Sequence, residues 1–252
     1  MKKIVIGNWK MNPSSLKEAE GLFKSITKNQ KDYKNIDVVV CAPFIYLSNL
    51  SKIKSGKVAL GAQDAFYEEQ GAYTGSVSAK MLANLKVKYC IVGHSERRAM
   101  NETDEMCNKK INALLKVGIT PILCVGEKER DLKHEYLNFV KNELIESLKG
   151  VPKSSLAKIV IAYEPIWAIG KNAEREVYAN ECQEMILFIK KVVASISSPS
   201  IAHNVRVVYG GSVNPNNSID LSINGNADGF LVGRDSLDPK KFIKIIENSQ
   251  VK

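Results

Sequence analysis

The chain has 252 residues, of which 44% are hydrophobic and 25% charged, with a formal net charge of +9 at pH 7. These proportions are typical of a globular protein with a sizeable core, and they exclude a disordered or fibrous chain. No apolar run approaches the ~20 residues of a membrane-spanning helix, and the apolar part of the start, MKKIVIGNWK, is too short for a signal peptide. We therefore expect a cytoplasmic protein with no membrane partner.

The five cysteines are widely scattered and odd in number. This pattern fits neither a disulfide framework nor a Cys-x-x-Cys metal site, so we expect reduced thiols and no bound metal. The lysines are spread over nearly every helical segment and do not form one block. That distribution favours a solvated basic surface over a nucleic-acid interface.

Eight short apolar segments recur along the chain with amphipathic helical segments between them. They are Lys3–Gly7, Ile36–Ala42, Lys57–Gln63, Lys88–Gly93, Ile119–Val125, Lys158–Tyr163, Val205–Gly210 and Ala227–Gly233. Each is a nearly continuous run of Val, Ile and Leu, which is typical of parallel strands that are covered on both faces.

Capping signals mark several of the helices between these strands. Asn214-Pro215 and Asp238-Pro239 each combine a favourable N-cap with proline at the first helical position. The Ser-rich segment Ser195–Asn204 is predicted to be a loop on the far face. Eight strand–helix units favour an α/β fold with one closed (β/α)8 barrel over residues 1–252. An open doubly wound sheet is the alternative, but no G-x-G-x-x-G follows the first strand.

In such a barrel the active site is built from the loops that follow the strands. The polar and small residues directly after the apolar segments are Asn8, Trp9, Lys10, His94, Ser95, Glu96, Arg97, Glu164, Gly211, Ser212, Gly233 and Arg234. A single glutamate or histidine at a strand end is commonly structural. The combination of a carboxylate, an imidazole, a lysine and small-residue turns at one end of the barrel indicates acid–base chemistry on an anionic substrate.

The motifs NWK, GHSERR, CVGE, YEPIWAIG, YGGSV and DGFLVG occur in this order between Lys3 and about Ile246. In this respect the chain resembles the triosephosphate isomerase family. The resemblance implies a TIM barrel of parallel strands and an isomerase (EC 5.3.1.1) of glycolysis and gluconeogenesis. Such an enzyme interconverts dihydroxyacetone phosphate and glyceraldehyde 3-phosphate through an enediolate, without a cofactor.

The resemblance also implies roles for individual residues. Glu164 corresponds to the catalytic base and His94 to the electrophile, whose ring nitrogen we expect to meet backbone N–H groups of the following turn. Lys10 supplies positive charge near the carbonyl and the phosphate, and Asn8 is a second donor to the substrate oxygen. Glu96 either orients Lys10, transfers a proton, or forms only a structural ion pair.

The phosphate-binding residues implied by the resemblance are Gly170, Ser212, Gly233 and Arg234, through their backbone N–H groups. Arg234 stands where the family commonly has a second glycine, so its side chain either points away or reaches the phosphate. Pro165–Trp167 resembles the hinge of a lid. Its tip, Lys171–Ala173, is shorter than the family pattern, so we expect a lid that still closes but is held less securely against Tyr209–Ser212.

A homodimer is also implied, because the loop Gly71–Ser78 resembles one that inserts Tyr73 into a partner subunit near Met11 and Glu96. Ser76 replaces a usual glutamate and removes one ion pair.

Two rival functions are a different phosphate-binding barrel enzyme and a non-catalytic barrel. The first would need a Schiff-base lysine or metal ligands at the strand ends, and the sequence shows neither. The second is disfavoured because the acid–base residues are all present.

Overall fold

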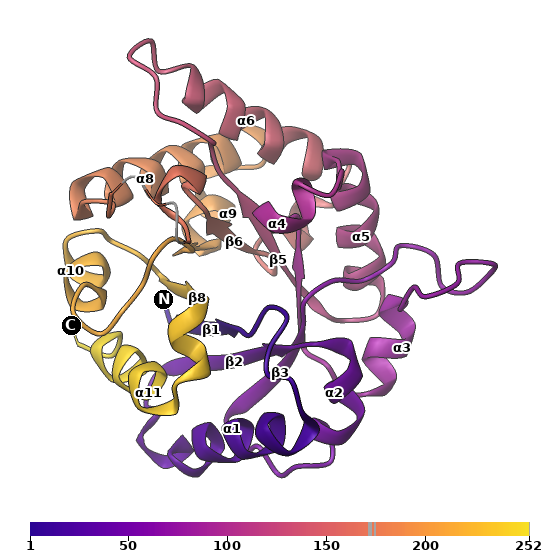
Figure 1. The fold of residues 1–252 in the computed structure, drawn as a ribbon. Helices are drawn as coiled ribbons and strands as arrows, with labels where there is room; N and C mark the ends of the chain where they lie inside the picture. The colour runs from indigo at the N-terminus through magenta and orange to yellow at the C-terminus, as the bar shows by residue number, and fades with distance from the viewer. Residues whose placement is uncertain (171–172, 174, 252) are drawn as a thin grey trace.

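The computed structural model describes residues 1–170, 173 and 175–251. Its strands form a closed barrel in the order β1 to β8, and every neighbouring pair is parallel (Figure 1). The strands are β1 (Lys3–Asn8), β2 (Ile36–Ala42), β3 (Val58–Ala62), β4 (Tyr89–Val92), β5 (Thr120–Val125), β6 (Val160–Tyr163), β7 (Arg206–Tyr209) and β8 (Gly229–Val232). Each lies within, or one residue beyond, a predicted apolar segment, so the predicted TIM barrel is confirmed.

Helices surround the barrel (Figure 1). They are α1 (Leu16–Lys28), α2 (Phe44–Leu50), α3 (Ala79–Asn84), α4 (Ser95–Arg98), α5 (Asp104–Lys116), α6 (Glu135–Ser147), α7 (Lys153–Leu156), α8 (Ala179–Ile196), α9 (Pro199–Asn204), α10 (Ser218–Ile223) and α11 (Pro239–Asn248). Short 3-10 turns are η1 (Gln30–Asp32), η2 (Ile166–Ala168) and η3 (Arg234–Leu237). None of the helices in the described ranges is long and apolar enough to cross a membrane.

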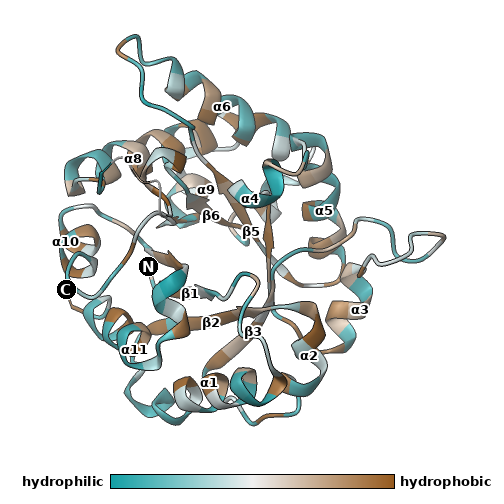
Figure 2. Ribbon diagram, in the orientation of Figure 1, coloured by the Kyte–Doolittle hydropathy of each residue, from teal (hydrophilic) through white to brown (hydrophobic). Residues whose placement is uncertain are grey.

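The strands are buried on both faces, as their continuous apolar sequences predict. Inside the barrel, side chains such as Ile6, Val39, Ile122 and Leu231 form one apolar cluster. The opposite faces of the strands join a larger cluster with the apolar sides of the helices. Figure 2 shows the brown, apolar strands inside a ring of helices that carry both brown and teal residues. The five cysteines are buried and free.

One predicted loop and one predicted helix start are wrong. The segment Ser195–Asn204 is not a loop, because α8 runs to Ile196 and α9 begins at Pro199, where the Ser198 side chain accepts a hydrogen bond from the N–H of Ile201. Helix α10 begins at Ser218, after the side chain of Asn214 has closed a turn by accepting hydrogen bonds from the N–H groups of Asn216 and Asn217.

The prediction for α11 is confirmed. Asp238 is its N-cap, Pro239 is its first residue, and the Asp238 carboxylate accepts hydrogen bonds of 2.9 Å and 3.2 Å from the N–H groups of Lys240 and Lys241. A carboxylate at this position satisfies backbone donors that have no partner within the helix.

Candidate active site

A cavity of about 450 Å³ lies at the carboxyl ends of the strands. All the site residues predicted from the sequence line it: Asn8, Lys10, His94, Glu96, Glu164, Gly170, Ser212, Gly233 and Arg234. They come from loops after five different strands and from the segment after η2, because the carboxyl ends of all strands of a parallel barrel face the same side. The structure thus brings together side chains that are far apart in the sequence.

His94 is fixed at the start of α4, where it is the N-cap residue and 6% exposed. The backbone N–H of Glu96 donates a hydrogen bond of 3.2 Å to Nδ1 of His94, as expected from the turn that follows it. Because Nδ1 accepts this bond, the ring proton is on Nε2. Nε2 lies 3.1 Å from Oε1 of Glu164.

Glu164 directly follows β6 and is 2% exposed. Its Oε2 accepts a hydrogen bond of 2.9 Å from the N–H of Ser95, and its own N–H donates to the carbonyl of Val125 at 2.8 Å. Its Oε1 has no aligned hydrogen-bond donor in the described part of the chain, despite the nearby ring of His94. One oxygen of a buried carboxylate at the cavity is therefore free to accept a proton.

Lys10 has a positive φ of 52°, a backbone conformation that is uncommon for residues other than glycine. The side chain of Asn8 stabilises it by accepting a hydrogen bond of 3.0 Å from the Lys10 N–H. The Gln63 amide donates to the carbonyl oxygen of Lys10 at 2.9 Å. The Lys10 ammonium pairs with Glu96 at 2.6 Å. Sequence reasoning missed Gln63, although it directly follows β3 just as the predicted residues follow their strands.

Small residues form the other end of the cavity. Gly210, Gly211, Ser212 and Gly233 line it, and the hydroxyl of Ser212 donates to the carbonyl of Ala168 at 2.8 Å. A Cβ on Gly210 would lie 3.0 Å from Cγ of Glu164. Backbone N–H groups in turns of small residues are suited to binding a phosphate at close range.

The family model of triosephosphate isomerase matches residues 3–249. The chain belongs to the triosephosphate isomerase family. This confirms the resemblance carried by the sequence motifs. Members of this family interconvert dihydroxyacetone phosphate and glyceraldehyde 3-phosphate, a step of glycolysis and gluconeogenesis.

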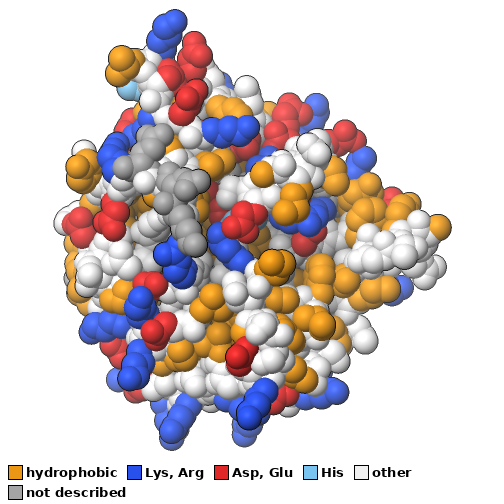
Figure 3. Space-filling model, in the orientation of Figure 1, with side chains coloured by type: hydrophobic (Ala, Val, Ile, Leu, Met, Phe, Trp, Pro, Cys, Tyr) orange, Lys and Arg blue, Asp and Glu red, His pale blue; other side chains and the backbone are white. Residues whose placement is uncertain are grey.

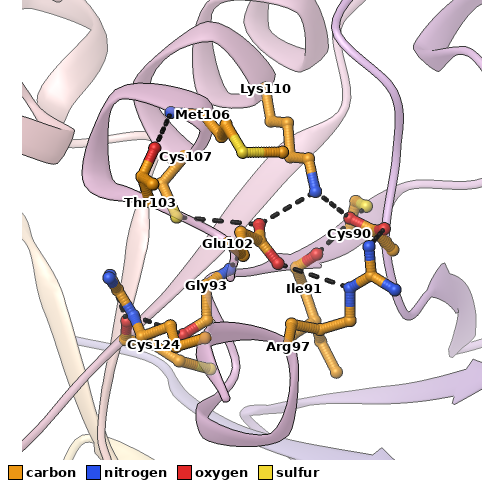
Figure 4. A network of polar contacts seen from close by, with 12 residues as sticks. Cys90, Ile91, Gly93, Arg97, Glu102, Thr103, Met106, Cys107, Lys110 and Cys124 are labelled. Atoms are coloured by element: carbon orange, nitrogen blue, oxygen red, sulfur yellow. Dashed lines mark hydrogen bonds and ion pairs between the residues drawn. The ribbon is translucent and has the colours of Figure 1, made fainter. Parts of the chain in front are cut away.

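A network of ion pairs joins α4, α5 and the segment between them next to His94 (Figure 4). Lys110 is 1% exposed and pairs with Asp64 at 2.6 Å and with Glu102 at 2.9 Å. Glu102 accepts a hydrogen bond from the N–H of Gly93, the residue before His94, and Asp64 also pairs with Arg97 at 2.6 Å. Burial opposes the charge of Lys110, but the two carboxylates raise its pKa above the ordinary value.

A second network lies between α4 and α6. Arg98 donates to the carbonyl of Gly93 at 2.8 Å and pairs with Asp104 at 2.6 Å and Glu143 at 3.3 Å. Glu143 accepts a hydrogen bond of 2.9 Å from the N–H of Gly126. The backbone of Gly126 lies directly against that of Glu164, since a Cβ on Gly126 would lie 1.8 Å from the carbonyl oxygen of Glu164. The hydrogen bond between Glu143 and Gly126 therefore fixes the backbone beside the predicted base. Burial raises the pKa of Glu143 to about 7.

Sequence reasoning missed both networks. Lys110, Glu102 and Glu143 lie on or beside helices, where a charged residue usually faces solvent. The segment predicted as the lid tip, Lys171–Ala173, falls largely outside the described residues, which resume with Ala173 and then Arg175. In the described part of the chain, no group of three or more His, Cys, Asp and Glu side chains is arranged to hold a metal ion.

Proposed function

We propose that this chain carries out the family reaction with Glu164 as the base and His94 as the electrophile. The observation that supports this assignment is the buried Oε1 of Glu164, which has no aligned hydrogen-bond donor among the described residues and lies 3.1 Å from Nε2 of His94 at the wall of the cavity. A base and a proton donor this close together can act on adjacent atoms of one small substrate.

A C–H group beside a carbonyl is a very weak acid, so its proton leaves only when a positioned base accepts it and the oxygen charge is stabilised. In the proposed mechanism, Glu164 takes the proton from one carbon and returns it to the neighbouring carbon. His94 donates a hydrogen bond from Nε2 to the carbonyl oxygen on which charge develops, and the proton of the neighbouring hydroxyl moves to that oxygen, so that the carbonyl and hydroxyl groups exchange places. Asn8 and the ammonium of Lys10 provide further stabilisation of the enediolate, and the chemistry needs no cofactor.

The phosphate is assigned to the end of the cavity formed by Gly170, Ser212, Gly233 and Arg234. Backbone N–H groups are suitable because they donate hydrogen bonds without titrating near neutral pH. For Glu96, the 2.6 Å ion pair with Lys10 favours the orienting role over proton transfer.

The substitution Glu164→Gln tests the assigned base in a coupled assay with glyceraldehyde 3-phosphate. An amide cannot accept the proton, so we expect kcat to fall by about 10²- to 10⁴-fold. A matched control is Glu105→Gln, which neutralises a carboxylate whose side chain is 77% exposed, and it should retain wild-type kcat. Turnover of the Glu164→Gln variant at the wild-type rate would exclude Glu164 as the base.

We also infer that residues 1–252 form one domain that assembles into a homodimer through the loop Gly71–Ser78. This loop belongs to a segment that projects from the barrel between β3 and α3 (Figure 1). Tyr73 in this loop is 44% exposed and Met81 in the following helix α3 is 55% exposed, and Met11 after β1 and Met100 after α4 are 95% and 71% exposed. Figure 3 shows orange side chains gathered beside this projection, and apolar patches of this kind commonly mark protein interfaces.

The family's role in glycolysis and the five free cysteines favour the cytoplasm as the compartment.

A further inference from the structure

The indole ring of Trp167 contacts two guanidinium groups. Trp167 lies in η2, three residues after Glu164, and is 6% exposed. Cζ of Arg175 lies 4.7 Å from the centroid of its ring, and Cζ of Arg130 lies 5.7 Å from it. Both distances are within the range in which a cation is attracted to an aromatic face.

Arg175 lies between the site and α8, and its side chain is 42% exposed, with the guanidinium paired to a carboxylate of α8. Its Nη1 and Nη2 donate hydrogen bonds of 2.7 Å and 2.6 Å to the two carboxylate oxygens of Glu181 in α8. Its Cζ also lies 5.1 Å from the ring of Tyr178. The hydrogen bond from Arg175 lowers the pKa of Glu181. A guanidinium with a two-bond carboxylate partner and two aromatic neighbours has little freedom to reorient.

The turn that contains Trp167 is anchored on its other sides as well. The N–H of Ile166 donates to the Glu127 carbonyl at 2.9 Å, and Nε1 of Trp167 donates to Oε1 of Glu127 at 2.9 Å. The hydroxyl of Ser212 donates to the carbonyl of Ala168. These bonds fix the edges of the turn, whereas Arg175 contacts the face of the indole ring.

Arg130 differs from Arg175 in its surroundings. Its Nη2 donates to the hydroxyl of Tyr163 at 3.3 Å, and its Nε lies 3.4 Å from Glu127. It therefore belongs to the group of side chains that holds Glu127, and its Nη1 also lies 3.7 Å from both Glu181 and Glu184 of α8. Arg175 makes the closer contacts, because its two short hydrogen bonds to Glu181 and its planar face on the indole ring join α8 to the turn after Glu164.

We propose that Arg175 is a positioning residue that holds the ring of Trp167, and through it the backbone turn next to Glu164, in the arrangement that the isomerisation uses. This inference rests on the proposed role of Glu164 as the base. A displaced turn would move the carboxylate relative to the substrate carbon, and misplacement of this kind lowers kcat more than it weakens binding.

The test compares Arg175→Ala and Arg175→Lys with the wild type. We expect either variant to lose about 3- to 10-fold in kcat, with a smaller change in KM for glyceraldehyde 3-phosphate. Lysine keeps the charge but has neither the planar face nor the two-bond fork, so it should not restore kcat. If Arg175→Lys had wild-type kcat, the loss in Arg175→Ala would be due to the missing positive charge alone, and the proposal would be overturned.

A double-mutant cycle with Trp167→Leu, which removes the aromatic face, tests whether Arg175 acts through the indole ring. If it does, Arg175→Ala lowers kcat much less in the Trp167→Leu background than in the wild type. Equal losses in both backgrounds would overturn the proposal. Lys24→Ala, which removes one charge from a surface ion pair with Glu20, is the matched control and should keep wild-type kcat.

The outcomes also separate this proposal from the proposed function. If Glu164→Gln is inactive while Arg175→Ala and Arg175→Lys both match the wild type, only the role of Arg175 fails. If Glu164→Gln remains fully active, the assignment of the base fails. Thermal unfolding of each variant identifies any loss of folded protein, and kcat is expressed per folded molecule.

Discussion

Arg234 is the residue whose role the sequence left open. Its side chain is exposed and lines the cavity next to Gly233, on the side where the phosphate is assigned. Lys10 approaches the same place, since a Cβ on Gly233 would lie 3.5 Å from Cε of Lys10. A guanidinium here is well suited to reach a phosphate directly, because its fork of donors matches phosphate oxygens.

We predict that Arg234→Gln raises KM for glyceraldehyde 3-phosphate by about 10-fold and changes kcat little, since a hydrogen bond to a charged group contributes about 1.5–3 kcal/mol. Inhibition by inorganic phosphate should weaken in parallel. Lys244→Gln removes a charge on α11 that pairs with Glu247, and it serves as the control with wild-type KM. An unchanged inhibition constant for phosphate would mean that the Arg234 side chain points away.

At this scale, the predicted residues were found because each directly follows a strand, and the parallel barrel brings all strand ends to one side. The supporting residues could not be found in the same way. Lys110 and Glu143 lie on helices with a local sequence no different from that of solvent-exposed charged residues. Their burial depends on partners such as Asp64 and Arg98, which are distant in the sequence.

At the scale of secondary-structure elements, the strands were predicted well because burial on both faces leaves a continuous apolar run. Helix starts were harder to predict. Asp238 and Asn214 both precede a proline, yet only Asp238 caps a helix, whereas Asn214 closes a turn before α10. The same local bonding serves turns and helix caps, so the neighbouring structure decides between them.

Helix α6 carries a carboxylate that makes stability depend on pH. Burial raises the pKa of Glu143 to about 7, against the pull of Arg98, from an ordinary value of 4.5. At pH values between these two pKa values, Glu143 is therefore protonated in the folded state and ionised in the unfolded state. By linkage, the free energy of unfolding falls as pH rises through this interval, by up to about 3 kcal/mol from this group.

We predict that Glu143→Gln removes this pH dependence, because an amide does not titrate. Urea unfolding at pH 5 and pH 7.5 should give a smaller difference in unfolding free energy for the variant than for the wild type. Glu68→Gln, at an exposed position, should behave as the wild type does. An equal pH difference in Glu143→Gln would show that Glu143 stays charged throughout this interval.

At the scale of the whole molecule, the barrel was predictable because eight similar units leave one closed arrangement that covers every strand on both faces. The assembly state could not be predicted from the fold in this way, because the structure of one chain does not show which part of its surface a partner covers. Met11, Tyr73, Met81 and Met100 are among the large apolar side chains that one chain leaves exposed. A second copy that receives Tyr73 would bury them by a symmetric exchange of loops.

We predict that the protein sediments as a dimer of 27.9 kDa chains, and that Tyr73→Asp shifts it towards the monomer because a carboxylate is costly to bury without a partner. Leu132→Asp is the matched control, since Leu132 is 99% exposed on a different projecting segment. Sedimentation velocity over a dilution series measures both variants. If the wild type is monomeric throughout the series, Tyr73 and the other exposed apolar side chains do not form a self-association surface. If Leu132→Asp dissociates the dimer as Tyr73→Asp does, the interface lies elsewhere on the barrel.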